Sequence, residues 1–296
     1  MSLRHTLRFI VNHPLNRDHK ALALARFLKW QIGSRLVPGA VVVDWVSGTR
    51  VIARRGETGF TQNIYCGLQD FEEMAYVLHV MTSQDLFIDV GANVGSYTLL
   101  CCAVRGARGY CFEPVPSTYR RLLDNLLLNE LSSRVRALNI GVADEDGELP
   151  FSTQENCTNH VILNSETSAA SIRVPVQKLD SILSGESPSL IKMDVEGFET
   201  SVLQGAQKTL ASTSLHSLLI ELNGSGKRYG VDEGHIFRLL SNYGFSPYRY
   251  SPFNRQLDLL PAKVTGSGNV LFVRNEAGVQ ERIHNAPTVR VHSCEF

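Results

Sequence analysis

An acid and two glycines lie close together at the end of an apolar segment, in LFIDVGANVGSYTLL (residues 86–100). Asp89 precedes the turn. The turn itself consists of Gly91, Ala92, Asn93, Val94 and Gly95. A strand that passes through a glycine turn into a helix presents backbone N–H groups, and glycine lets a ligand approach the backbone closely. In open α/β sheets such turns lie at the carboxyl ends of the strands, where ligands bind.

The spacing of the glycines and the charge of Asp89 restrict the kind of ligand. The dinucleotide fingerprint G-x-G-x-x-G makes room for a pyrophosphate, whereas this turn has Gly91-x-x-x-Gly95. A carboxylate at Asp89 repels a phosphate and attracts an ammonium group. We therefore expect a nucleoside ligand with an amino-acid end and no phosphates. S-adenosylmethionine fits this description, with Asp89 facing its amino group.

The next two strands predict the rest of the nucleoside site. YCFEP ends at Glu113 and Pro114, and a carboxylate at this position accepts hydrogen bonds from both ribose hydroxyls, as it also does in NAD enzymes. In ALNIGVAD, the backbone of Gly141 or Val142 would pair with the adenine ring, and Asp144 would accept from its amino group. Simple turn chemistry in the sequence DEDG explains Asp144 equally well.

A fourth apolar run carries the candidate catalytic acids. LIKMDVEGFE places Asp194 and Glu196 where a buried strand ends, and buried acids are costly unless they bind something. Asp194 and Glu196 are our first candidates for a general base, and Asp194 could instead contact the methionine part of the cofactor. Glu196 or Glu199 could also simply cap the next helix.

The following apolar run, LLIELN, supplies the second candidates. Glu221 and Asn223 at its end are expected to shape the pocket for the acceptor, the second substrate, which would receive a group from S-adenosylmethionine. With Asp194, these oxygens would also suit Mg²⁺, a hard ion that prefers carboxylate and amide oxygens. No residue demands a metal, so metal use stays open.

Strands and helices alternate from residue 86 to residue 244, which predicts a parallel sheet built by right-handed crossovers. The last two extended runs, 246–252 and 269–275, follow without a helix and predict an antiparallel end to the sheet. Before residue 70 we expect an amphipathic helix over 18–33 and a hairpin around Ser47-Gly48. Residues 152–172 are expected to form a loop or short irregular strands.

In the helix expected over 18–33, one face is apolar. This stripe consists of Leu22, Leu24, Ala25, Leu28 and Ile32, and basic residues lie elsewhere on the helix.

Composition limits the class of protein. The 296 residues are 43% hydrophobic, which is enough for one large core, and the formal net charge of zero suggests no nucleic-acid partner. Residues 1–60 carry ten Lys/Arg and three Asp/Glu, so a basic arm could meet an acidic partner, a membrane surface or a phosphorylated substrate, or form a solvated helix face. No secretory signal or membrane-spanning run is evident, so we expect a cytoplasmic protein.

The six cysteines have no C-x-x-C spacing, which predicts reduced thiols rather than a disulfide frame or zinc site. They are Cys66, Cys101, Cys102, Cys111, Cys157 and Cys294.

Five segments in order resemble the FkbM family of S-adenosylmethionine-dependent methyltransferases. They are FIDVGANVGSYT, FEPVPSTYRRLLDNLLLN, ALNIGVADEDGELPF, VPVQKLDSIL and IKMDVEGFETSVLQGAQKTL. The resemblance covers about residues 70–225 and implies a class I methyltransferase fold: a Rossmann-like three-layer α/β sandwich with a mostly parallel seven-stranded sheet and an antiparallel last strand. It also implies O-methylation of a hydroxyl on a sugar or natural product. We expect an N-terminal extension over 1–69 and a methyltransferase domain over 70–296.

Three other functions remain open. N-methylation of a neutral amine would need no strong base. A nicotinamide-dependent oxidoreductase is disfavoured by the glycine spacing and by Asp89. A non-catalytic cofactor-binding protein is disfavoured by the intact pair Asp194 and Glu196. The sequence leaves the acceptor and the oligomeric state open.

Overall fold

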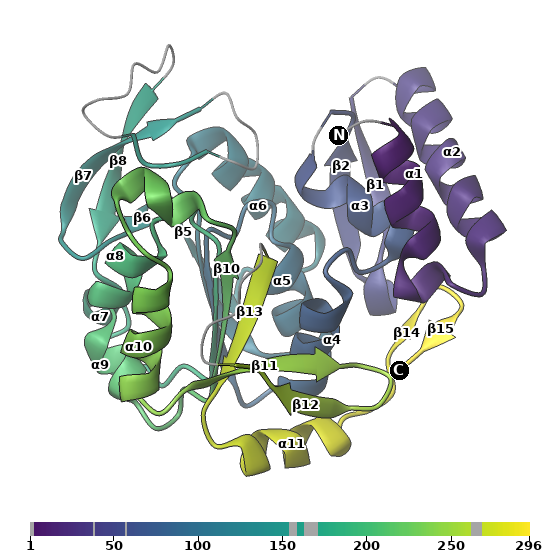
Figure 1. Ribbon diagram of the computed structural model, residues 1–296. Coiled ribbons are helices and arrows are strands. Elements are labelled where there is room, and N and C mark those ends of the chain that lie inside the picture. Colours follow the sequence, from purple (N-terminus) through teal and green to yellow (C-terminus); the bar gives the residue numbers. More distant parts are fainter. Residues whose placement is uncertain (1–2, 38, 57, 154–158, 163–170, 262–267) are drawn as a thin grey trace.

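The computed structural model describes all residues except 1–2, 38, 57, 154–158, 163–170 and 262–267 (Figure 1). At its centre lies an eight-stranded sheet. In spatial order its strands are β12 (Gln256–Leu259), β11 (Ser246–Ser251), β13 (Gly268–Val273), β10 (Ser217–Leu222), β9 (Leu190–Met193), β3 (Leu86–Val90), β4 (Arg108–Phe112) and β5 (Val135–Leu138). Helices cover both faces, so the three-layer α/β prediction is confirmed.

The direction of the strands follows the prediction. β5, β4, β3, β9 and β10 run parallel, and β13 lies antiparallel between β10 and β11. β12 adds an eighth strand from a segment that the sequence analysis left in a loop, because the chain turns back after β11 and pairs with it at the edge. The predicted strand over ALNIGVAD is divided between β5 and a smaller sheet. That sheet has the order β6 (Gly141–Val142), β8 (Ser171–Gln177) and β7 (Gly147–Ser152).

Alternation along the central strands divides the hydrophobic core into two clusters, one on each face of the sheet. Phe87, Leu190 and Leu219 pack against one helical layer, whereas Ile88 and Ile191 pack against the other. The first layer contains α4 (Phe71–Val80), α5 (Ser96–Thr98), the π-helical turn η3 (Leu99–Val104) and α6 (Pro116–Leu128). The second contains α7 (Leu179–Ile182), α8 (Glu199–Gln204), α9 (Gln207–Ala211) and α10 (Gly234–Asn242). η5 (Ser225–Tyr229) connects β10 to α10.

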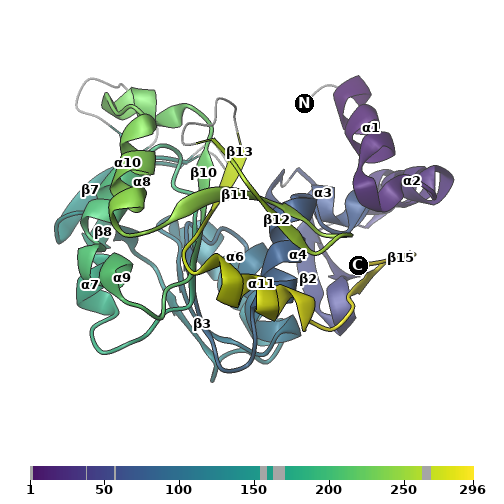
Figure 2. The ribbon, with the colours of Figure 1, turned by 60° about the horizontal axis from the view of Figure 1, so that its bottom comes forward.

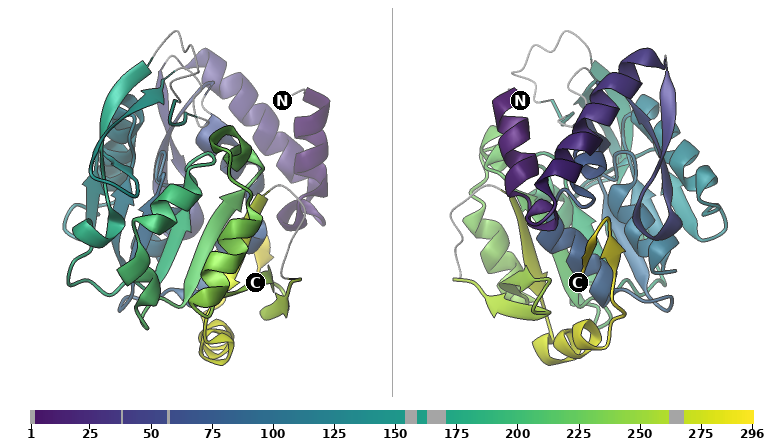
Figure 3. Two further views of the ribbon diagram at one scale, coloured as in Figure 1. Left: turned by 60° about the vertical axis from the view of Figure 1, so that its left-hand side comes forward. Right: turned by 90° about the vertical axis from the view of Figure 1, so that its right-hand side faces the viewer.

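The N-terminal segment packs beside the first helical layer (Figure 3). It comprises α1 (Leu3–Asn12), η1 (Pro14–Asn16), α2 (Lys20–Leu36), the hairpin of β1 (Ala40–Asp44) and β2 (Arg50–Arg54) with η2 (Val46–Gly48) between them, and α3 (Thr58–Cys66). Ile10 and Phe27 belong to the same buried cluster as Met74 of α4. The domain boundary at residue 69 remains a prediction, but the two regions share one core.

The helix predicted over 18–33 exists, but it turns a different face to the protein. The buried residues of α2 are Ala23, Phe27, Trp30 and Ser34. Leu22, Leu28 and Ile32 of the predicted apolar stripe are exposed instead. The helix was predicted correctly because apolar spacing is local, whereas the face that packs depends on the partner surface.

Five of the six cysteines are described as free thiols, as predicted, and Cys157 lies outside the described residues. Much of the irregular segment predicted over 152–172 also lies outside them.

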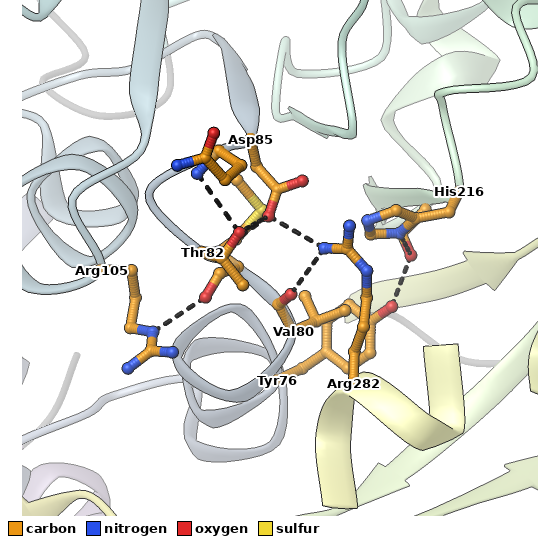
Figure 4. Close-up of polar contacts among 10 residues, drawn as sticks. Tyr76, Val80, Thr82, Asp85, Arg105, His216 and Arg282 are labelled. Carbon is orange, nitrogen blue, oxygen red and sulfur yellow. Dashed lines mark hydrogen bonds and ion pairs between the residues drawn. The ribbon is translucent and has the colours of Figure 1, made fainter. Parts of the chain in front are cut away.

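A polar network joins the C-terminal helix α11 (Glu276–His284) to the turn between α4 and β3 (Figure 4). Arg282 donates hydrogen bonds to the Val80 carbonyl (3.2 Å) and to the Asp85 carboxylate (2.9 Å). The same Asp85 oxygen accepts from the backbone N–H (2.8 Å) and the hydroxyl (2.7 Å) of Thr82. Burial opposes ionisation of Asp85, but these bonds hold its pKa below the usual value. The chain then ends in the short pair β14 (Arg290–Val291) and β15 (Cys294–Glu295).

We expect Arg282→Met to lower the free energy of unfolding by about 2 kcal/mol, because it leaves the buried Asp85 carboxylate without its cation. Urea denaturation at pH 7 measures this loss. Because Arg282 lowers the folded-state pKa of Asp85, its contribution is present above the unfolded-state pKa of about 3.9 and disappears as the pH falls through the folded value. The difference between wild type and variant should therefore shrink below about pH 4. Arg290→Met, at an exposed position on β14, is the control, and an equal loss there would contradict the assignment.

Candidate active site

A cavity of about 900 Å³ lies at the carboxyl ends of the central strands. The sheet contributes residues that follow β3, β4, β9 and β10, and the N-terminal segment contributes residues of α1, α2 and α3. The cavity therefore has a wall made by the sheet and a wall made by the N-terminal helices. Eleven of the predicted site residues line it: Asp89, Gly91, Ala92, Asn93, Glu113, Pro114, Gly141, Val142, Asp194, Glu196 and Glu221.

The turn after β3 uses much of its hydrogen-bonding capacity within the protein. The backbone N–H groups of Gly91 and Ala92 donate to the Phe112 carbonyl, and the Asn93 N–H donates to Glu113 (3.1 Å). The Gly95 N–H donates to the Ala92 carbonyl. The sequence predicted that this turn exposes backbone N–H groups to a ligand, but these amides are bonded within the protein. A phosphate would therefore find no free donor among them.

Asp89 lies buried beneath the same turn. Its carboxylate accepts hydrogen bonds from the Thr98 backbone N–H (3.1 Å) and hydroxyl (2.5 Å). Burial raises the pKa of Asp89 to about 6, although the bonds from Thr98 oppose the shift. Asp89 thus fixes the start of α5 while also lining the cavity, and its contact with an amino group remains a prediction.

Three glycines allow the loops of the site to approach one another. A Cβ on Gly91, whose φ is +81°, would lie 1.9 Å from the Asp194 carbonyl oxygen. A Cβ on Gly197 would lie 2.6 Å from the backbone of Ser225, after β10. A Cβ on Gly95 would lie 2.7 Å from Leu122 of α6. Gly91 therefore serves the contact between two loops, and not only the approach of a ligand.

Glu113 is buried at the end of β4. Its two carboxylate oxygens accept from the backbone N–H groups of Asn93 (3.1 Å) and Val115 (2.9 Å). Burial raises the pKa of Glu113 to about 7, with these two bonds opposing the shift. A carboxylate oxygen accepts more than one hydrogen bond, so Glu113 keeps acceptor capacity toward the cavity.

The sequence left two roles open for Asp144, adenine binding or turn formation, and the structure places it as a turn residue. It is exposed, and its carboxylate accepts a hydrogen bond from the Ser201 hydroxyl (2.6 Å). Asp144 is not among the residues that line the cavity, although Gly141 and Val142 are. Its predicted contact with adenine has no support in this arrangement.

The candidate catalytic acids form one cluster. Carboxylate oxygens of Asp194, Glu196 and Glu221 lie within 4.8 Å of one another. Burial and the nearby Asp194 raise the pKa of Glu196 to about 7. Burial and a hydrogen bond with Asp194 raise the pKa of Glu221 well above its usual value. Because these pKa values are raised, the cluster favours keeping a proton shared among its acids at neutral pH when no cation is bound.

Lys192 is the cation at the base of this cluster. It is 3% exposed, and its Nζ lies 3.8 Å from the Asp194 carboxylate. Burial would lower the pKa of Lys192, but attraction to Asp194, Glu221 and Asp70 raises it. The lysine is therefore charged and already paired.

The two glutamates after Asp194 have different roles. Glu199 is buried and accepts from the backbone N–H groups of Gly197 (3.1 Å) and Val195 (3.3 Å), so it stabilises the loop. Glu196 has a positive φ of 55° and lines the cavity. Asn223, a predicted Mg²⁺ ligand, also lines the cavity, but its Oδ1 accepts from the Ser225 N–H (2.9 Å). The oxygen chemistry of the three acids suits a hard cation, but no second feature of the site indicates one.

Sequence reasoning missed several residues of the cavity. Asp70, just before α4, lies near Lys192 and accepts from the Tyr97 hydroxyl (3.4 Å). Lys192 Nζ lies 5.4 Å from the centre of the Tyr97 ring. A lysine inside the apolar run LIKM was a detectable signal, because a buried lysine needs acidic partners. Asp70 lies outside every motif and carried no such signal.

The sheet order and its helical layers define a Rossmann-like α/β fold, and the class of protein follows from a family comparison. A family model described as Methyltransferase FkbM domain matches residues 89–247, which is more than half of the chain. The chain therefore belongs to the FkbM methyltransferase family.

Two methyltransferases are similar to this chain at low sequence identity. Hexuronic acid methyltransferase AglP of Haloferax volcanii is 27% identical over 186 residues, which cover 62% of this chain and 72% of that protein. Methyltransferase sdnD of Sordaria araneosa is 27% identical over 172 residues, which cover 47% of this chain and 66% of that protein, just under two thirds of it. Among solved structures, M. jannaschii TYW2 in complex with AdoMet aligns with a TM-score of 0.42 at 13% identity, covering 80% of this chain and 89% of that chain.

Gly91→Ala tests the contact between the β3 turn and the loop after β9. The control is Gly185→Ala, because Gly185 has nearly the same φ (+83°) but open space where its Cβ would lie. We expect the control to cost about 1–2 kcal/mol of unfolding free energy, which is the cost of a left-handed alanine. Gly91→Ala should cost at least about 2 kcal/mol more, because a methyl group also displaces the Asp194 carbonyl. Urea denaturation compares the two, and equal losses would show that backbone strain alone acts at Gly91.

Proposed function

We propose that this protein transfers a methyl group from S-adenosylmethionine to a hydroxyl group of a small neutral acceptor, such as a sugar or a secondary metabolite. The observation that carries the proposal is that a single cavity gathers the β3 turn, Glu113 and the three clustered acids. Membership of a methyltransferase family gives the reaction class. The cavity gives the arrangement of donor and acceptor sites.

The charge of the cavity fits a cationic ligand. Its lining includes Asp70, Asp89, Glu113, Asp194, Glu196 and Glu221 but, among the described residues, only one lysine and no arginine. A sulfonium group and an ammonium group would offset this excess of negative charge. A pyrophosphate would meet the acids, and the amides of the β3 turn that could bind it donate elsewhere. These observations favour S-adenosylmethionine over a nicotinamide dinucleotide.

Particular residues would hold the two ends of the ligand. Glu113 would accept hydrogen bonds from the ribose hydroxyls, and the backbone around Gly141 and Val142 would lie beside the adenine. The ammonium group of S-adenosylmethionine would lie near the carboxylates of Asp70 and Asp89, which both line the cavity.

The N-terminal helices supply the wall that an acceptor would meet. Phe9, Phe27 and Tyr65 provide aromatic surface, and the amide side chains of Gln31 and Gln62 line the same region. Gln31 donates a hydrogen bond to the Tyr65 hydroxyl (3.0 Å). Such a wall suits an uncharged ring with hydroxyl groups, whereas a carboxylate on the acceptor would find, within the described part of the lining, no cation other than the paired Lys192.

The chain's own contribution to the reaction is alignment and proton transfer. Bound S-adenosylmethionine supplies an activated methyl group. Glu196 or Glu221 would take the proton of the acceptor hydroxyl. As it does so, the hydroxyl oxygen of the acceptor would bond to the methyl carbon, and the bond between that carbon and the sulfur would break. The product sulfur is neutral and the carboxyl is protonated, so charge and atoms balance. The cavity, between the sheet and the N-terminal helices, would hold the two reactants in line.

Calorimetry with S-adenosylmethionine and its demethylated product tests the proposal, with NAD as the competing ligand. We expect Glu113→Gln to weaken cofactor binding about 10- to 100-fold, the size of a lost charge-assisted hydrogen bond. Glu145→Gln, at an exposed turn, should leave binding unchanged. Binding of NAD without any heat from S-adenosylmethionine would overturn the proposal.

The pH dependence of kcat/KM identifies the base. A carboxylate base works when deprotonated, so activity should be present above its pKa in the free enzyme and fall as the pH decreases through that value. If Glu196 is the base, this limb lies near pH 7, and Glu196→Gln removes it. If Glu221 is the base, the limb lies at higher pH and disappears in Glu221→Gln. A flat profile between pH 6 and pH 9 would exclude both.

A further inference from the structure

Large exposed hydrophobic residues are concentrated in the N-terminal segment. Seven of the ten such residues described in the structure lie within residues 3–42, so they are not scattered over the surface as single exposed residues usually are. The seven are Leu3, Leu22, Leu28, Ile32, Leu36, Val37 and Val42. α1 and α2 project from one side of the molecule, away from the central sheet (Figure 2).

The spacing on α2 places most of these residues on one face. Leu28, Ile32 and Leu36 follow one another at intervals of four residues, and each is more than half exposed. The helix packs against the protein through a different face, which includes Phe27 and Trp30. α2 thus has two apolar faces, and one of them is covered by no described residue.

The two helices themselves carry charge of one sign, although the exposed Asp18 lies just before α2. α1 and α2 together contain no acidic residue and six basic ones: Arg4, Arg8, Lys20, Arg26, Lys29 and Arg35. All except Arg26 are exposed. An exposed apolar stripe bordered by Lys and Arg is the pattern of helices that lie in the interface of anionic membranes.

We propose that α1 and α2 dock on the surface of an anionic lipid bilayer, with the stripe Leu22, Leu28, Ile32 and Leu36 in the headgroup layer and the basic side chains on lipid phosphates. This is peripheral binding, since no helix within the described residues is long and apolar enough to cross a bilayer.

Charge and shape favour a bilayer over other partners. A symmetric contact with a second copy through α1 and α2 would bring together two helical surfaces whose only charged residues are basic, which is unfavourable. α2 is also a single helix of 17 residues on an outer surface, so a flat layer can meet its whole length.

The same helices lead to the cavity. Leu3 of α1 is 63% exposed and also lines the cavity, which places an opening at the start of α1. Phe9 of α1 and Phe27 of α2 line the cavity further along. Because the helices that would dock also line the cavity, we infer that the acceptor is a hydroxyl compound carried by a lipid or partitioned into the membrane. This last step depends on the proposed function, whereas the docking itself does not.

Cosedimentation of the full chain with vesicles tests docking. Vesicles of phosphatidylcholine alone are compared with vesicles that contain phosphatidylglycerol, without S-adenosylmethionine. We expect the protein to bind the anionic vesicles at least tenfold more strongly than the neutral ones. Raising the salt from about 50 to about 500 mM should weaken this binding, because salt screens the attraction between exposed charges. The double variant Leu28→Gln/Ile32→Gln should reduce partitioning at least tenfold.

A matched control separates the stripe from general surface hydrophobicity. Leu127→Gln/Leu259→Gln removes two equally exposed leucines from elsewhere on the surface and should bind vesicles as wild type does. Equal losses in both double variants, or no preference for anionic vesicles, would overturn the proposal. So would a concentration-dependent dimer in sedimentation velocity that is lost in Leu28→Gln/Ile32→Gln, because the stripe would then join two copies. Calorimetry with S-adenosylmethionine on the same variants reports the proposed function separately, since failure of cofactor binding would leave the vesicle result standing.

Discussion

The cavity carries more negative charge than its own cation can balance. Among the described residues, six carboxyl groups line it, whereas the one lysine there, Lys192, is buried and already paired with Asp194. Such an arrangement is stable without a ligand only if some of the acids retain protons, as the raised pKa values of Glu113, Glu196 and Glu221 indicate. A cationic ligand would lower these pKa values and release protons. The charge of the site is therefore the main argument for the proposed cationic ligand.

Close backbone contacts create this crowding. Because neither Gly91 nor Gly197 has a side chain, the loop after β9 can touch both the turn after β3 and the loop after β10. Asp194 and Glu196 are thereby brought to Glu221, although these residues come from different strands. Gly91 was predicted as a ligand contact, and the structure gives it a second role, in which it lets the loop that carries Asp194 and Glu196 approach the turn after β3.

The sequence predicted the sheet wall of the site well, because its signals are local. Buried parallel strands are continuous apolar runs, so the end of each run marks the place of Glu113 or Asp194. Three features could not be read in this way. The exposed face of α2 depends on which surface Phe27 and Trp30 find, Asp70 reaches the cavity from outside the motifs, and Asp144 was indistinguishable from a turn residue.

The two walls of the cavity have different origins, and this limits what relatives can say about the acceptor. The family match begins at residue 89, so the wall made by α1, α2 and α3 lies outside it. The matched region contains Asp89, Glu113, Asp194, Glu196 and Glu221, which would face the proposed sulfonium ligand. Under the proposed function the acceptor would meet Phe9, Phe27 and Tyr65 instead, and the helices α1 and α2 also carry the exposed apolar stripe. If both proposals hold, acceptor choice and membrane docking belong to one structural unit, and a change in these helices would alter both while leaving the methyl-donor site intact.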